Sequence, residues 1–229
     1  MTLLVAAGDP SCLVENAWVC GEYLRTRQDL LVDATRQHLY LTVVSVVLGL
    51  VVAFPLALLA RRYRTTQGAV LGTATGLYTI PSLAMFSLLL PVTGLGSDTV
   101  IIGLVLYSLT ILVRNIIAGL DGVPADVKES ATGMGYGPAR MLLRVELPLA
   151  LPTIMAGVRV ATVSTVALAT IGTIVGAGGL GNLLDQAIPS QFRAQILTAA
   201  VLCVVLAVVL DVILLVVQRV LTPWTRRAA

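Results

Sequence analysis

The side chains that usually perform chemistry are scarce in this sequence and form no catalytic pattern. There is one histidine, His38, there is one lysine, Lys128, and the three cysteines have no C-x-x-C metal-site spacing. Neither an H-E-x-x-H nor a G-x-S-x-G string occurs, which argues against a metalloprotease or a serine hydrolase. Lys128 precedes glutamate, so no G-x-x-x-x-G-K-[ST] phosphate loop exists. We therefore expect no catalytic residue, metal site or nucleotide site in this chain.

Three ionisable residues lie within or beside long apolar stretches, namely Arg114, Arg159 and Asp211. Charged groups inside a bilayer are costly and usually pair with one another or serve a function. Asp211 comes eight residues before Arg219, which is about 12 Å of helix, so it lies too deep to be well hydrated. We expect a structural ion pair of Asp211 with either Arg114 or Arg159, and contact with a transported solute is the alternative.

The composition explains why charges are so informative here. The 229 residues are 57% hydrophobic and only 12% charged, and the mean hydropathy is +0.94. Soluble domains carry about 25% charged residues, and disorder requires low hydrophobicity. The net charge of +3 is too small and dispersed to indicate nucleic-acid binding. The chain is expected to be an all-α, polytopic protein that contacts membrane lipid.

Stretches free of Asp, Glu, Lys and Arg locate the membrane spans, because such residues are normally excluded from mid-bilayer. About five transmembrane helices are expected, at residues 39–60, 69–90, 99–120, 153–176 and 194–217. Residues 1–37 form an N-terminal segment, and residues 38–225 form the transmembrane domain. His38, at the edge of the first span, is expected to anchor the membrane interface rather than to bind a ligand.

The distribution of basic residues predicts the orientation in the cell membrane. Loops after the first, third and fifth spans hold nine Lys and Arg residues, whereas those after the second and fourth hold only Arg193. The basic loops are expected in the cytoplasm. The N-terminal segment is then extracytoplasmic and the C-terminus cytoplasmic, although three arginines in the segment 1–37 are a mild objection.

The orientation places two cysteines on the oxidising side, where disulfides persist. Cys12 and Cys20 have seven residues between them, enough to bring the two α-carbons to the separation of about 5.5 Å that a bridge needs. We expect either a disulfide that orders the N-terminal segment or two free thiols in a mobile tail. Cys203, in the fifth span, is expected to stay reduced.

The polar loop at 121–152 carries the most informative pattern. Asp126 is placed to cap a helix, with Glu129 three residues later to complete a capping box. A break around Gly135 precedes Pro138, which suits the first turn of a second helix, and Pro148 is expected to end that helix. We expect a short helix-turn-helix on the inner membrane surface. It is either an amphipathic linker or a docking element for a cytoplasmic partner.

The spacing in this loop resembles the EAA signature of binding-protein-dependent ABC importer permeases, usually E-A-A, three residues, G, nine residues, I, one residue, L-P. The matching positions are Glu129, Ser130, Ala131, Gly135, Val145, Leu147 and Pro148. Ser130 and Val145 are small departures from the usual Ala and Ile. The segments 38–42, 79–84, 112–115 and 176–181 are similar to the osmoprotectant branch, which serves glycine betaine, choline or carnitine.

The resemblance implies a MetI-like fold and a function as the permease subunit of an importer, not as an enzyme. Two permease chains, identical or paralogous, would assemble with a pair of ATPases and an extracytoplasmic solute-binding protein. ATP and Mg²⁺ would bind to the ATPases, and no cofactor to this chain. The seven EAA positions would dock the ATPase, so residues 121–152 are called the coupling loop below. A permease for methionine or sulfonates is the alternative; an intramembrane enzyme or a passive channel is less well supported.

Two further groups of residues are candidates to line the translocation path. Pro81 interrupts the second span, and irregular backbone at membrane depth is tolerated only against protein or a water-filled cavity. Small residues also cluster at the outer end of the fourth span, where they allow close approach. The candidate path residues are Tyr78, Thr79, Pro81, Ser82, Gly176, Gly178, Gly179 and Gly181. A harmless kink and a plain helix end are the structural alternatives. With so few aromatic residues, no complete aromatic cage for quaternary ammonium is expected in this chain.

Overall fold

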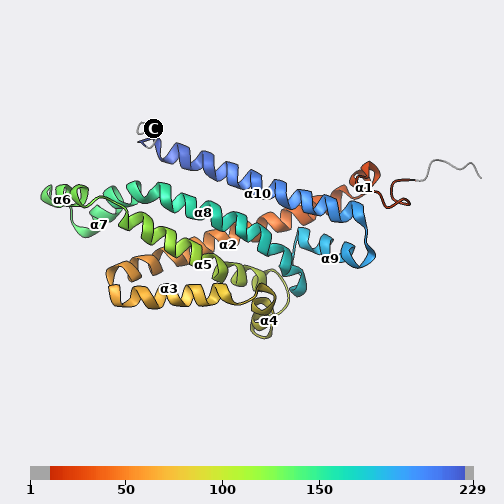
Figure 1. Ribbon diagram of the computed structural model, residues 1–229, viewed down its shortest axis with the longest axis horizontal. Helices are drawn as coiled ribbons and strands as arrows, with labels where there is room; N and C mark the ends of the chain where they lie inside the picture. The colour runs from red at the N-terminus through yellow and green to blue at the C-terminus, as the bar shows by residue number, and fades with distance from the viewer. Residues whose placement is uncertain (1–10, 225–229) are drawn as a thin grey trace, which may run out of the picture.

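The structure, a computed structural model, describes residues 11–224 apart from the side chain of Arg64, and this part of the chain contains helices and turns without strands. Four helices are long and apolar enough to cross a membrane, and a bent pair makes a fifth candidate span. The expected all-α architecture with about five transmembrane helices is confirmed. Figure 1 shows an elongated bundle with α6 and α7 at one end and α1 and α9 at the other.

The helices follow one another with short connections. They are α1 (Gly21–Thr26), α2 (Gln28–Arg62), α3 (Arg64–Thr79), α4 (Ser82–Thr93), α5 (Ser97–Asp121), α6 (Ala125–Gly133), α7 (Pro138–Met141), α8 (Leu147–Ala169), α9 (Leu180–Ser190) and α10 (Arg193–Leu221). A π-helical turn, η1 (Leu142–Glu146), joins α7 to α8, and a 3₁₀ segment, η2 (Thr170–Val175), extends α8.

The helices α2, α5 and α8 form the core of the bundle. Small residues at helical spacing let them approach closely: Ala53, Ala57 and Ala60 of α2 are fully buried in this cluster. A Cβ added at Gly157 of α8 would lie 2.6 Å from Cγ of Asn115 on α5. Small residues at such contacts are typical of membrane helices, which associate through close packing rather than through the hydrophobic effect.

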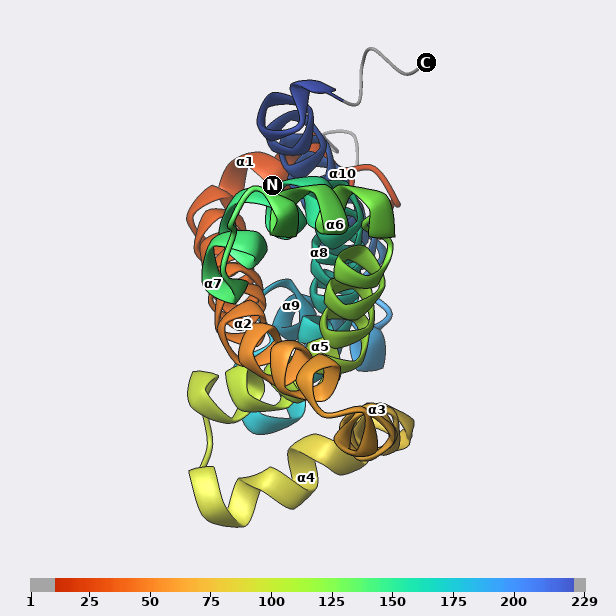
Figure 2. The same ribbon diagram turned by 90° about the vertical axis from the view of Figure 1, so that its left-hand side faces the viewer.

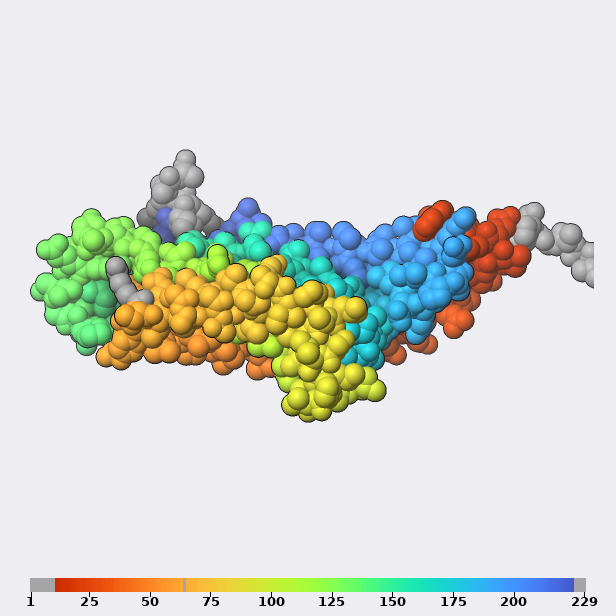
Figure 3. All heavy atoms as spheres, turned by 60° about the horizontal axis from the view of Figure 1, so that its bottom comes forward, coloured from red at the N-terminus to blue at the C-terminus, as the bar shows by residue number. Residues whose placement is uncertain are grey.

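The second expected span is broken rather than kinked. The helices α3 and α4 meet at 99°. The break is at Pro81, which has no amide hydrogen to donate, and Ile80 before it adopts an extended conformation (φ −66°, ψ 126°). Figure 2 shows α3 and α4 lying to one side of α2, α5 and α8, and in Figure 3 the α4 region projects from the body.

The coupling loop also differs from expectation, because Pro148 does not end a helix. Residues 138–175 run as one continuous helical rod, so the second helix of the loop is the beginning of the fourth span. Pro148 cannot donate a hydrogen bond to the preceding turn, and the chain adopts the wider π-helical turn at 142–146 just before it. The expectation of a separate surface helix is wrong.

The end of the molecule opposite α6 and α7 contains two helices beyond the expected spans. The helix α2 begins at Gln28, so the boundary expected at residue 38 lies inside a continuous helix. The segment between the fourth and fifth spans folds into α9, which packs against η2 and α10. The short helix α1 precedes α2, and the C-terminal end of α10 lies toward the α6 and α7 end (Figure 1).

Candidate functional site

The turn between α6 and α7 is built around Gly135. Its φ of +82° lies in the left-handed region, where glycine is favoured. Its amide donates to the carbonyl of Thr132 at 2.9 Å, and the amide of Tyr136 donates to the carbonyl of Ala131 at 3.1 Å. This pair of bonds is the Schellman arrangement that terminates a helix. The motif glycine therefore fixes the angle at which the chain leaves α6.

The other motif positions lie on both sides of this turn. Glu129 and Ser130 are exposed on α6, whereas Ala131 is buried. Val145 lies in η1, and Leu147 and Pro148 open α8. The expected capping box is wrong, because α6 begins at Ala125 after Pro124 and no side chain caps its first turn.

Large apolar side chains project from the same end of the molecule. Met134 is 70% exposed and Leu143 is 62% exposed, on either side of the Gly135 turn. The guanidinium of Arg140 lies 5.6 Å from the centre of the Tyr136 ring, which stiffens the connection between α6 and α7. The end of the bundle carrying α6 and α7 thus presents an exposed, partly apolar surface suited to a protein partner.

A charge cluster at the base of the coupling loop was missed by sequence reasoning. Arg61, near the end of α2, donates two hydrogen bonds to the Glu146 carboxylate, at 2.6 and 2.7 Å. It also donates to Asp121 Oδ1 at 2.9 Å, and Lys128 Nζ lies 3.8 Å from Glu146 Oε1. The Glu146 side chain is only 9% exposed. Arg61 and Glu146 are 85 residues apart in the sequence. The one sequence signal for this pair is that the acidic Glu146 lies between the apolar motif residues Val145 and Leu147.

The intramembrane charges form one pair. Arg159 of α8 donates from Nε and Nη2 to the two carboxylate oxygens of Asp211 on α10, both at 2.8 Å. Arg114 instead donates to Thr75 Oγ1 at 2.8 Å. The paired side chains are 26% and 31% exposed and border a hollow of about 400 Å³ on the α8 and α10 surface. Such a pair avoids contact with hydrocarbon only if protein or water covers this hollow.

The candidate path residues of the second span lie at the break between α3 and α4. Tyr78, Thr79 and Pro81 are exposed, and Ser82 is half-buried. Tyr78 packs edge-to-face on Tyr107 with ring centres 5.9 Å apart, and the Tyr107 hydroxyl donates to the carbonyl of Ile80. The break thus combines polar groups with an exposed, non-helical backbone, held in place from α5.

The glycines after the fourth span lie in a tightly packed loop. Gly176 is exposed with φ +82°, but Gly178, Gly179 and Gly181 are buried. A Cβ at Gly179 would lie 2.7 Å from Cβ of His38, and one at Gly181 would meet the backbone of Thr170. A Cβ at Gly178 would lie 2.7 Å from the amide nitrogen of Thr173. Close packing thus explains why small residues occur at all three buried positions.

His38 proves to be buried, which corrects the expectation that it anchors the membrane interface. Its side chain is inaccessible, its Nε2 lies 3.0 Å from the carbonyl oxygen of Val166, and its Nδ1 accepts from the amide of Leu180 at 3.3 Å. The ring therefore links α2 to α8 and to the start of α9. No group of three potential metal ligands occurs among residues 11–224.

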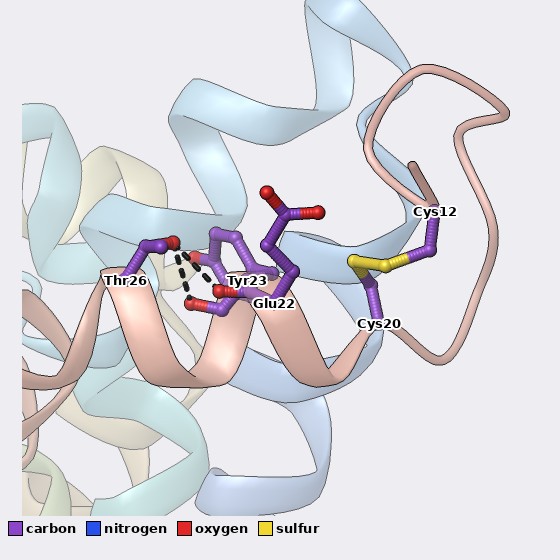
Figure 4. Close-up of a disulfide and its surroundings, with 5 residues drawn as sticks. All are labelled: Cys12, Cys20, Glu22, Tyr23 and Thr26. Atoms are coloured by element: carbon purple, nitrogen blue, oxygen red, sulfur yellow. Dashed lines mark hydrogen bonds between the residues drawn. A yellow bond between two sulfur atoms is a disulfide. The ribbon is translucent and has the colours of Figure 1, made fainter. Parts of the chain in front are cut away.

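The N-terminal segment is attached to the turn between α9 and α10. Cys12 and Cys20 form a disulfide, with their α-carbons 5.5 Å apart (Figure 4). Inside the loop they close, Asn16 donates to the carbonyl of Gln191 and accepts from the amide of Arg193, both at 2.9 Å. The segment therefore binds the α9–α10 turn as a structured loop.

Comparisons with known proteins agree with this architecture. The chain matches the family described as "Binding-protein-dependent transport system inner membrane component" over residues 45–227. It is 35% identical to the choline transport system permease protein OpuBB of Bacillus subtilis over 202 residues, which cover 88% of this chain and 93% of that protein. It is 37% identical to the osmoprotectant import permease protein OsmW of Salmonella typhimurium over 187 residues, which cover 79% of this chain and 87% of that protein.

A solved structure supports the fold independently. A chain of the inward-facing MetNI methionine ABC transporter superposes with a TM-score of 0.77, at 24% identity, covering 86% of this chain and 98% of that one. The fold and the loop at its end define a multi-pass membrane permease. The chain belongs to the family of binding-protein-dependent transport system inner membrane components. It is a permease subunit of an ABC importer, and membership implies a solute-binding protein and an ATPase as partners.

Proposed function

We propose that this chain forms the translocation path for a small osmoprotectant such as choline, glycine betaine or carnitine. Relatives at 35 to 40% identity are named as permeases for these solutes. In the proposed assembly two permease chains, identical or paralogous, meet around the path. The solute-binding protein delivers solute at the α1 and α9 end, and the ATPases bind at the α6 and α7 end.

The observation that carries the proposal is the exposed turn of the coupling loop. It has the seven motif positions at family spacing and presents Met134 and Leu143 beside a helix ending that Gly135 terminates. Exposed apolar groups outside the bundle suit contact with a protein partner or with lipid, and the motif spacing favours the protein partner. We assign Glu129, Ser130, Ala131, Gly135, Val145, Leu147 and Pro148 to this docking element.

Solute passage is assigned to the irregular backbone of the bundle. The α3–α4 break supplies Tyr78, Thr79, Pro81 and Ser82, and the exposed Gly176 borders the glycine loop. Gly178, Gly179 and Gly181 contribute by allowing close packing. Alternating access would result when the loaded binding protein and ATP each favour a different conformation.

Competition for uptake tests the solute class. Cells that rely on this system for choline uptake are expected to lose most labelled choline import when unlabelled glycine betaine or carnitine is in excess. Methionine and an alkanesulfonate at the same excess are the controls and are expected to leave import unchanged. Inhibition by methionine or the sulfonate but not by the quaternary ammonium solutes would favour the alternative permease class.

The cysteines provide a test of orientation, which we propose as N-terminus outside. In a Cys203→Ser background, a membrane-impermeant maleimide should label intact cells only after an impermeant reductant has opened the Cys12–Cys20 bond. A matched variant with all three cysteines replaced by serine and with Arg140→Cys in the coupling loop should react only once the membrane is broken. Labelling with the opposite sidedness would overturn the proposed orientation.

A further inference from the structure

Four segments of the chain meet at the charge cluster beneath the coupling loop. Arg61 comes from the end of α2, Asp121 from the end of α5, Lys128 from α6 and Glu146 from η1. Arg61 and Lys128 also donate to the carbonyl of Leu120, at 3.4 and 3.5 Å. This carbonyl lies in the last turn of α5, where cations are favoured by the helix dipole. The cluster thus links the coupling loop to two helices of the core.

The contacts in this cluster differ in strength. The Arg61 guanidinium binds Glu146 through both terminal nitrogens, and the carboxylate is 9% exposed. The Asp121 carboxylate, which Arg61 also binds, is 53% exposed. Exposed pairs contribute little because water and salt screen them, whereas a two-pronged contact to a largely buried carboxylate imposes a fixed geometry. The connection between α2 and the loop therefore depends on Glu146.

Glu146 is also the last residue of the π-helical turn that leads into α8. A π-turn is a local departure from regular helix, and it is often found at functional sites. Arg61 therefore contacts the helical segment 138–175 at the turn where its winding changes from π-helical to α-helical. The α6–α7 turn is thus connected to α2 through the Arg61–Glu146 ion pair and to α8 through the continuous backbone.

We infer that Arg61 and Glu146 are positioning residues which transmit movement of the coupling loop to α2 when the ATPases close. This inference rests on the proposed function, because it presupposes an ATPase docked on α6 and α7. Lys128 assists by holding the α6 end of the loop against the same carboxylate. Asp121 is accessory, since it binds the same guanidinium from a solvent-exposed position.

The test compares two isosteric variants in the assembled complex of permease, ATPase and binding protein in proteoliposomes. Glu146→Gln is expected to leave basal ATP hydrolysis and complex assembly unchanged but to lower the stimulation by loaded binding protein about tenfold, within the usual range of coupling between sites. Asp121→Asn, which removes the other carboxylate partner of Arg61, is the matched control and should stay within about twofold of wild type.

The outcomes separate the inference from the proposed function. If the wild-type complex shows no stimulation, the proposed function fails. If wild type is stimulated and Glu146→Gln is stimulated equally, the inference is overturned. Should Glu146→Gln not assemble, Arg61→Lys decides, because it keeps the charge but loses the two-pronged contact: reduced stimulation with normal basal hydrolysis supports the inference, and normal stimulation contradicts it.

Discussion

Replacing Gly135 with arginine is expected to reduce solute-stimulated ATP hydrolysis to the basal rate while leaving the protein inserted in the membrane. The φ of +82° costs a residue with a side chain about 1–2 kcal/mol, so the Schellman turn between α6 and α7 would be strained. A Cβ at this position meets no atom within 4 Å, so the rest of the bundle should fold. The measurement is ATP hydrolysis by the reconstituted complex with and without loaded binding protein.

Gly135→Asn is the matched control for this experiment. Asparagine tolerates the left-handed conformation better than other residues, so most of the stimulation should remain. Coupling in Gly135→Arg equal to wild type would refute the role of the turn. Equal loss in both variants would show that any side chain at this position blocks docking, which contradicts the conformational explanation.

Replacing Gly181 with alanine is expected to destabilise the folded protein strongly. The added Cβ would lie 2.7 Å from the carbonyl carbon of Thr170 and closer still to its oxygen. These are backbone atoms of η2, which cannot move as a flexible side chain does. Overpacking in a rigid core costs about 1–3 kcal/mol and sometimes more, and we expect at least the upper value. The apparent melting temperature of detergent-purified protein measures the effect.

Gly72→Ala in α3 is the control, because a Cβ there meets nothing within 4 Å. This change should be neutral or stabilise the helix by up to about 1 kcal/mol. If Gly181→Ala melted at the same temperature as Gly72→Ala, the close contact between Gly181 and the Thr170 backbone would be contradicted. The result would then favour a purely path-lining role for Gly181.

The spans could be predicted from the sequence because charges delimit them directly. The structure places α5 at Ser97–Asp121 and α10 at Arg193–Leu221, within four residues of the expected 99–120 and 194–217. The sequence also predicts the position of the break at Pro81, but it does not predict the angle of 99° between α3 and α4. Proline removes a donor, but packing against neighbouring helices determines how far the chain then bends.

The pairing of distant side chains could not be predicted in the same way. Asp211 had two possible partners, and the choice of Arg159 over Arg114 depends on how α8 and α10 are rotated about their axes. Glu146 binds Arg61 from within a π-helical turn, and the sequence carries no periodic signal for such a turn. His38 was misplaced because a lone histidine at the end of a span does not reveal that α9 folds back over it.

We propose that the coupling loop lets ATP hydrolysis on a partner drive osmoprotectant through this permease. The most direct measurement is uptake of labelled choline, glycine betaine or carnitine into proteoliposomes containing the complete complex, with ATP supplied on the side of the ATPase. We expect solute to accumulate inside above the external concentration. This accumulation should require ATP and the binding protein and should disappear in Gly135→Arg. Uptake that only equilibrates, at the same rate without ATP, would contradict it.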